Sequence, residues 1–163
     1  LQSTSLDYSA CKCTVGYSGE AHNCILCTPG TFKNTVSSDA CALCAPGSFS
    51  GLGDGAAGAT NCKACPHASQ APAGSALRSA CMCNAGYTGA DGGPCLECSP
   101  GTWKNATGSV ECSGCASNSF SAAASVVASA CICNAAFTGP SGGPCQFCAA
   151  GKYKNSSGSE LCR

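Results

Sequence analysis

Cysteine is the residue that most constrains how this chain can fold. The sequence contains 19 cysteines in 163 residues, a density that marks a disulfide scaffold in a secreted chain. Disulfides persist in oxidising compartments, whereas cytosolic thiols are kept reduced. The cysteine content therefore predicts an extracellular protein, either secreted or held at the cell surface.

The apolar residues point to the same dependence on covalent bonds. The hydrophobic fraction is 44%, but most of it is Ala and Cys. A single core for a chain of this length would need many large aliphatic and aromatic side chains. A chain that cannot bury enough apolar surface must be held together by disulfides, by metal ions or by assembly.

The charge of the chain excludes some partners and suggests others. Only 10% of the residues are charged and the formal net charge is zero, less charge than soluble surfaces usually carry. We therefore expect attached glycans, or self-association with filament partners, to cover part of the surface. The sequence has no basic patch for nucleic acid.

The sequence has no apolar run near the roughly 20 residues that span a bilayer, so we expect no membrane insertion in this segment. It opens without a signal peptide, as expected of a mature or internal fragment.

Three segments of the chain align with one another: SACKCTVGYSGEAHNCILCTPGTFKN, SACMCNAGYTGADGGPCLECSPGTWKN and SACICNAAFTGPSGGPCQFCAAGKYKN. The cysteines of the second copy recur fifty positions later in the third. The step from Cys11 to Cys81 is about seventy, because the first copy carries an extra closed segment from Cys44 to Cys62. Repeats that accept a whole inserted loop are typical of linear arrays, in which each unit contacts mainly its neighbours.

The repeat predicts both the fold class and the domain boundaries. We expect a small disulfide-rich fold, an elongated tandem array of cysteine-rich repeats with little regular secondary structure and short β-hairpins. Gly-Gly, Pro-Gly and Ser-Gly pairs mark the turns. The predicted divisions are the end of a preceding unit (1–10), a first repeat with an inserted loop at 44–62 (11–80), a second repeat (81–130) and a truncated third repeat (131–163).

Spacing alone does not determine which cysteines pair. The segments 27–41, 98–112 and 148–162 share their length and the pattern C-x-x-G-x-aromatic, so equivalent segments should pair equivalently. This favours a sequential scheme: Cys13–Cys24, Cys27–Cys41, Cys44–Cys62, Cys65–Cys81, Cys83–Cys95, Cys98–Cys112, Cys115–Cys131, Cys133–Cys145 and Cys148–Cys162. Cys11 is left over, with its expected partner upstream of Leu1. An interleaved alternative joins Cys98 to Cys115 and Cys112 to Cys131, and leaves Cys148 and Cys162 to pair downstream.

Two patterns resemble known extracellular modules. The stretch C-x-C-x-x-G-Y-x-G-…-C, at 11–24 and 81–95, resembles the C-terminal half of an EGF-like module; the third copy departs from it with Ala136-Phe137. The stretches C-x-x-G-x-[FWY]-K-N-…-C-x-x-C resemble the ephrin-receptor-like cysteine-rich repeat, which is related to TNF-receptor modules. Arrays of this Gly-, Ala- and Ser-rich kind are similar to large surface proteins of algae and other protists, with flagellar-hair (mastigoneme) proteins as the nearest analogy. The acidic residues of a calcium-binding EGF-like module are missing, so the resemblance implies no calcium site.

Aromatic residues follow each Cys-x-x-Gly, at Phe32, Phe49, Trp103 and Tyr153. The loops have little else to bury, so we expect each ring to pack on the disulfide of its own loop. The same expectation covers three aromatics of the C-x-C segments: Tyr17, Tyr87 and Phe137. The alternative is a repeated stripe of binding residues along the array.

Two sequons predict covalent glycans. Asn105-Ala-Thr and Asn155-Ser-Ser match the N-glycosylation pattern, whereas the equivalent Asn34-Thr-Val does not. Because the two sequons occupy the same place in the repeat, in a turn-rich segment of a predicted extracellular chain, we expect glycans at Asn105 and Asn155.

Metal binding and catalysis find little support. The spacing of Cys41/Cys44 and Cys62/Cys65 would suit zinc, but the continuous series of cysteines, the EGF-like half-motif and the sequons favour disulfides, so we expect no metal and no cofactor. The two histidines, His22 and His67, lie in unrelated loops, and the acids are scattered. General acid–base catalysis needs a paired and positioned set. We therefore predict no catalytic residue and no enzymatic activity.

Three functions fit these features. The first is a structural component of an extracellular filament or cell-surface appendage, similar to mastigoneme proteins, in which the array is a glycosylated rod. The second is a spacer or ligand-binding stalk of a cell-surface receptor or adhesion protein. The third is a disulfide-rich inhibitor or an enzyme appendage, for which the inserted loop 44–62 is the one candidate. The uniform repeats favour the first.

Overall fold

The computed structural model describes residues 11–20, 23–51 and 57–163. The predicted end of a preceding unit, residues 1–10, lies outside the described residues, as does His22. The chain divides into two compact units, Leu1–Cys81 (unit 1) and Met82–Arg163 (unit 2), and each is described by itself.

The fold is small and disulfide-rich. Nine disulfides join each cysteine from Cys13 onward to its neighbour along the chain, with paired Cα atoms 5.5 to 5.7 Å apart. These are the pairs of the sequential scheme, and the interleaved pairs do not form. Cys11 is a free, exposed thiol.

Each disulfide closes one hairpin, and the hairpins are numbered here in chain order. In unit 1 they are hairpin 1 (Cys13–Cys24), hairpin 2 (Cys27–Cys41), hairpin 3 (Cys44–Cys62) and hairpin 4 (Cys65–Cys81). In unit 2 they are hairpin 5 (Cys83–Cys95), hairpin 6 (Cys98–Cys112), hairpin 7 (Cys115–Cys131), hairpin 8 (Cys133–Cys145) and hairpin 9 (Cys148–Cys162).

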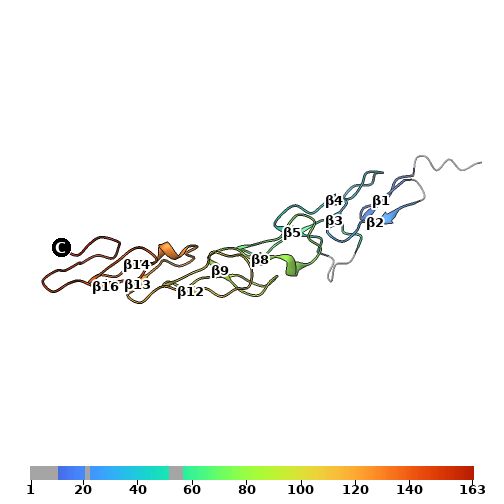
Figure 1. The fold of residues 1–163 in the computed structure, drawn as a ribbon. Coiled ribbons are helices and arrows are strands. Elements are labelled where there is room, and N and C mark those ends of the chain that lie inside the picture. Colours follow the sequence, from blue (N-terminus) through green and yellow to red (C-terminus); the bar gives the residue numbers. More distant parts are fainter. Residues whose placement is uncertain (1–10, 21–22, 52–56) are drawn as a thin grey trace, which may run out of the picture. The chain divides into compact units, whose positions relative to one another are not determined.

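The strands of unit 1 are two residues long, and six of them form antiparallel pairs. Figure 1 draws this unit in the blue to green part of the ribbon. The pairs are β1 (Tyr17–Ser18) with β2 (Ile25–Leu26), β3 (Thr31–Phe32) with β4 (Ala42–Leu43), and β5 (Ser48–Phe49) with β6 (Lys63–Ala64). The unit also contains β7 (Ser69–Gln70) and a turn of 3-10 helix, η2 (Arg78–Ala80).

Unit 2 repeats this construction. It begins with β8 (Met82–Cys83) and contains a second 3-10 turn, η3 (Ala128–Ala130). Its strand pairs are β9 (Tyr87–Thr88) with β10 (Leu96–Glu97), β11 (Thr102–Trp103) with β12 (Ser113–Gly114), β13 (Ser119–Phe120) with β14 (Ile132–Cys133), and β15 (Phe137–Thr138) with β16 (Gln146–Phe147).

A tight turn opens every hairpin, three residues after its first cysteine. In hairpin 2, the amide of Thr31 donates to the carbonyl of Thr28 at 3.0 Å across Pro29-Gly30, and Gly30 has a φ of +86°. Proline followed by a positive-φ glycine is the signature of a type II turn. The equivalent position has positive φ in all nine hairpins: Gly16, Gly30, Gly47, Ala68, Gly86, Gly101, Asn118, Ala136 and Gly151.

The spacing C-x-x-C has a structural explanation in these turns. The two residues between the cysteines form a strand that pairs with the first strand of the preceding hairpin. Ile25–Leu26, between Cys24 and Cys27, pairs in this way with Tyr17–Ser18. The first cysteine therefore closes one hairpin and the second opens the next. The two sulfurs of each C-x-x-C belong to different disulfides, so neither is a thiolate that could bind zinc.

Sulfur makes up most of the buried interior. Eight cysteines are buried among the described residues, and the one large apolar side chain buried with them is Phe49, which is 8% exposed. Phe49 packs with Ala71 and Cys81, and Cys65 lies against this cluster. Phe49 thus contacts the disulfide of the following hairpin, which corrects the expectation that it would pack on its own.

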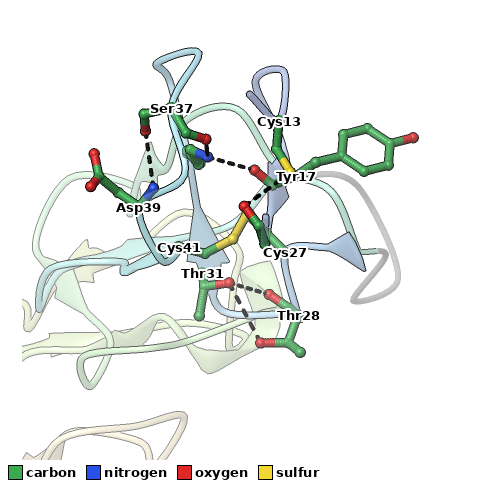
Figure 2. The surroundings of a disulfide bond; sticks show 10 residues. Cys13, Tyr17, Cys27, Thr28, Thr31, Ser37, Asp39 and Cys41 are labelled. Atoms are coloured by element: carbon green, nitrogen blue, oxygen red, sulfur yellow. Dashed lines mark hydrogen bonds between the residues drawn. A yellow bond between two sulfur atoms is a disulfide. The ribbon is translucent and has the colours of Figure 1, made fainter. Parts of the chain in front are cut away.

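The packing prediction is also wrong for Tyr153, which is 66% exposed. The ring of Tyr17 points away from the bond between Cys27 and Cys41, the disulfide of the next hairpin (Figure 2). The ring of Phe137 instead makes an edge contact with Phe147 across its strand pair, with centroids 4.7 Å apart.

Candidate functional site

Three buried lysines occupy equivalent positions in the repeat. Lys33, Lys104 and Lys154 each follow the aromatic residue of the C-x-x-G-x-[FWY]-K-N pattern, and they are 4%, 3% and 7% exposed. Lysine is almost never fully buried unless its ammonium group is paired. Each ammonium group must therefore have partners inside the fold.

In hairpin 2 these partners are backbone carbonyls. The Nζ atom of Lys33 donates to the carbonyl oxygen of Tyr17 at 2.9 Å and to that of Ser37. Figure 2 shows Tyr17 and Ser37, whose carbonyl oxygens accept these bonds, together with the disulfide from Cys27 to Cys41. Because Tyr17 belongs to hairpin 1, the lysine side chain links two successive hairpins.

Unit 2 contains the same arrangement twice. Lys104 donates to the carbonyl oxygens of Tyr87, at 2.6 Å, and Gly108. Lys154 donates in the same way, to Phe137 at 2.9 Å and to Gly158. In each case the lysine links a hairpin that begins at the second cysteine of a C-x-C to the hairpin after it. We call this arrangement the lysine clamp.

The hydrogen bonds of the clamp lysines all go to carbonyl oxygens, and none goes to a carboxylate, among the described residues. The ion pair present in the described part of the chain joins Arg163 to Glu160 at 3.9 Å on the surface. Burial lowers the pKa of Lys104, and the charge of Asp91 raises it again in part. Hydrogen bonds from a charged donor are stronger than those from a neutral one, so two carbonyl dipoles suit a buried ammonium group.

Backbone bonds reinforce the same junctions. The amides of Gly16, Gly86 and Ala136 each donate, at 2.8 Å, to the carbonyl oxygen of the clamp lysine in the next hairpin. Serine takes the place of lysine in hairpins 3 and 7, where Ser50 and Ser121 are fully buried. The hydroxyl of Ser121 donates to the carbonyl oxygen of Thr102 in hairpin 6 at 2.9 Å.

The predicted glycan acceptors lie directly beside two of the clamps. Asn105 and Asn155 follow Lys104 and Lys154 in the sequence, and both are exposed. The burial of these lysines was not predicted, although the sequence contains a signal for them. An aromatic-Lys-Asn triplet ends all three aligned segments.

Of the two histidines considered for catalysis, the structure describes one. His67 is exposed in hairpin 4. The described residues contain no group of histidines, cysteines and carboxylates able to hold a metal ion. Within the same residues, no helix is long and apolar enough to cross a bilayer. The clamps bind backbone groups of the protein itself, so what this site does physically is to join hairpins.

Comparison with known families agrees with the cysteine-rich character of the chain. Residues 16–52 match the family model described as tyrosine-protein kinase ephrin type A/B receptor-like. The matched segment includes hairpin 2 and its clamp lysine, Lys33. A comparison with curated proteins finds no match. The EGF-like resemblance of the C-x-C segments remains a prediction.

Proposed function

We propose that this chain is a structural component of an extracellular filament or cell-surface appendage of the mastigoneme kind, with no catalytic activity. The observation that carries the proposal is the repeated linkage of hairpins within each unit. Each hairpin is closed by its own disulfide, lysine clamps join hairpins 1 and 2, 5 and 6, and 8 and 9, and buried serines join hairpins 2 and 3 and hairpins 6 and 7. A chain of this kind suits spacing and load-bearing, because the same closed hairpin and the same lysine clamp recur along the described part of the chain.

The cellular location follows from the same bonds. Nine disulfides in one short chain require an oxidising compartment. An ephrin-receptor-like segment is also in keeping with an extracellular or cell-surface place. We propose secretion, covalent glycans and self-association as parts of this function.

The alternative is a spacer or ligand-binding stalk of a cell-surface receptor or adhesion protein. The description of the matched family, which names a receptor class, favours this alternative. A ligand-binding stalk would concentrate charged or apolar side chains in one hairpin. Instead the exposed apolar residues are spread over both units: Ile25, Val36, Leu43, Leu96, Val110, Phe147, Tyr153 and Leu161.

Electron microscopy of native material released from its source tests the proposal. We expect regular filaments into which repeated copies of these hairpins can be fitted. Reduced and alkylated material is the control, and its filaments should come apart because the hairpins lose the bonds that close them. Single projecting chains that end in a larger globular domain would overturn the filament proposal in favour of the receptor stalk.

A further inference from the structure

The lysine clamps shape three short turns on the surface, at residues 33–37, 104–108 and 154–158. In each turn the side chain of the first residue donates to the carbonyl oxygen of the last. The amide of that last residue donates in turn to the backbone carbonyl oxygen of a buried cysteine in the preceding hairpin. In unit 2 these bonds run from Gly108 to Cys83 and from Gly158 to Cys133, both at 2.8 Å. Both ends of the turn are therefore fixed to the interior.

The residues between these ends point away from the interior. Asn105, Ala106 and Thr107 are all exposed, as are the three residues at 155–157. The structure gives the side chains of Asn105 and Thr107 no hydrogen bond among the described residues. A group attached to the Asn105 amide would therefore break no contact of the fold.

The turn of hairpin 2 has the same construction. Lys33 closes it onto Ser37, and the amide of Ser37 donates to the carbonyl oxygen of Cys13 at 3.1 Å. Asn34 is exposed like Asn105. The difference lies at the third position of the sequon, where exposed Val36 replaces the hydroxyl residue Thr107.

We propose that the lysine-clamped turn is a platform for an asparagine-linked oligosaccharide and that Asn105 and Asn155 carry this glycan. Asn34 lies in an equivalent turn without a sequon, and a hydroxyl residue at position 36 would make it an acceptor. The donor is a lipid-diphosphate-linked oligosaccharide. The Asn Nδ2 atom forms a bond to the first sugar carbon, the bond from that carbon to the diphosphate oxygen breaks, and the diphosphate takes up the amide proton. The inference rests on the extracellular route in the proposed function.

Mass spectrometry of the native protein tests occupancy. Treatment with peptide N-glycanase in ¹⁸O-water converts a glycosylated asparagine to labelled aspartate. We expect the label at Asn105 and Asn155, and unlabelled asparagine at Asn34. Unlabelled Asn105 and Asn155 in protein that retains its nine disulfides would overturn this inference and leave the extracellular proposal intact. Native protein in which the cysteines from Cys13 onward are reduced would overturn the extracellular proposal itself.

A gain of modification tests the platform directly. In the full chain secreted from eukaryotic cells, V36T should add one glycan, at Asn34. V36A is the matched control, since it removes the same valine without supplying a hydroxyl, and it should add none. T107A should lose the glycan at Asn105 alone. A V36T protein that is secreted with nine disulfides but without glycan at Asn34 would show that the turn is not sufficient as an acceptor.

Discussion

The ammonium group of Lys104 lies 2.6 Å from the carbonyl oxygen of Tyr87, seventeen residues earlier in the chain. Tyr87 belongs to hairpin 5 and Lys104 to hairpin 6, so this contact joins two covalently closed loops that no disulfide connects. The relationship recurs between Lys33 and Tyr17. The disulfides define the hairpins, and the lysines fix how consecutive hairpins meet.

Replacing Lys104 by methionine should destabilise unit 2. K104M keeps the apolar stem but leaves the carbonyl oxygens of Tyr87 and Gly108 without their donor, and a buried unpaired carbonyl costs about 1–3 kcal/mol. Relief of the buried charge offsets part of this cost, so we expect a net loss of about 2 kcal/mol. Thermal unfolding under oxidising conditions measures it. K152M, at an exposed lysine, is the control; equal midpoints for the two variants would contradict a role for the clamp.

The same lysine should make the stability of unit 2 depend on alkaline pH. The folded-state pKa of Lys104 is lowered, chiefly by burial, from its ordinary value of 10.5. At pH values between the lowered pKa and 10.5, Lys104 is protonated in the unfolded chain and deprotonated in the folded chain. The free energy of unfolding therefore rises with pH through this window, and the cost of the buried charge is fully present below it. The neutral amine still has two N–H donors for its two carbonyls.

NMR titration of the Lys104 side chain measures this shift. The C11S background removes the free thiol, so that disulfide exchange does not interfere at high pH. We expect a midpoint below 10.5, and a still lower one in D91N, which lacks the opposing carboxylate. A midpoint at or above 10.5 would refute the inference that burial dominates.

Two glycines with similar backbone angles should respond differently to alanine. Gly86 and Gly101 have φ values of +80° and +82°. A Cβ at Gly86 would lie 2.5 Å from the carbonyl oxygen of Ala124, whereas one at Gly101 meets no atom within 4 Å. G101A should therefore cost about 1 kcal/mol for the backbone strain alone, and G86A about 1–3 kcal/mol more for the overlap. Equal losses in chemical denaturation would mean that the chain relaxes around the added methyl group.

Ala136 occupies the position of Gly86 in the third repeat and has a φ of +69°. Its L side chain already bears the strain that G86A would introduce. A136G should therefore stabilise unit 2, by about 1 kcal/mol or less, because glycine adopts this φ freely. A lower unfolding midpoint for A136G would show that the methyl group contributes packing that outweighs the strain.

Removing one disulfide should have a local effect. C98A/C112A opens hairpin 6, whose cysteines are 14 residues apart, and a loop of that size is worth about 3 kcal/mol. Amide hydrogen exchange should speed up in hairpin 6 and at Gly86 and Ala124, whose amides bond to Lys104 and Cys98. The amides of unit 1 should keep their protection. C148A/C162A, in hairpin 9, is the matched control; loss of protection throughout the chain in either variant would indicate one cooperative unit.

The hairpins and their closure were predictable because they depend on local spacing. The segments 27–41 and 98–112 have equal lengths, and the pairing scheme that treats them alike is the one that forms. Pro-Gly pairs such as Pro29-Gly30 likewise indicated the turns. These features need contacts between residues fewer than twenty positions apart, which a sequence displays directly.

Contacts between hairpins were harder to predict. Phe49 packs on the disulfide of hairpin 4, and its backbone also forms a parallel bridge with Ser75 of that hairpin. The burial of Lys104 also depends on where hairpin 5 presents a carbonyl oxygen. Nothing in the residue type of a lysine indicates that two backbone acceptors lie within its reach.

The placement of the disulfides has a mechanical consequence. Under tension, force passes through the disulfide from one cysteine of a hairpin to the other. The loop between the two cysteines, whose sequence separation is 11 to 18, carries no load and cannot lengthen the chain. Stretching can straighten only the short links between bonded pairs, such as Ile25 and Leu26 between Cys24 and Cys27. A pulled chain should therefore be nearly inextensible until its sulfur–sulfur bonds are reduced, and a reductant would convert a stiff tether into a long, compliant one.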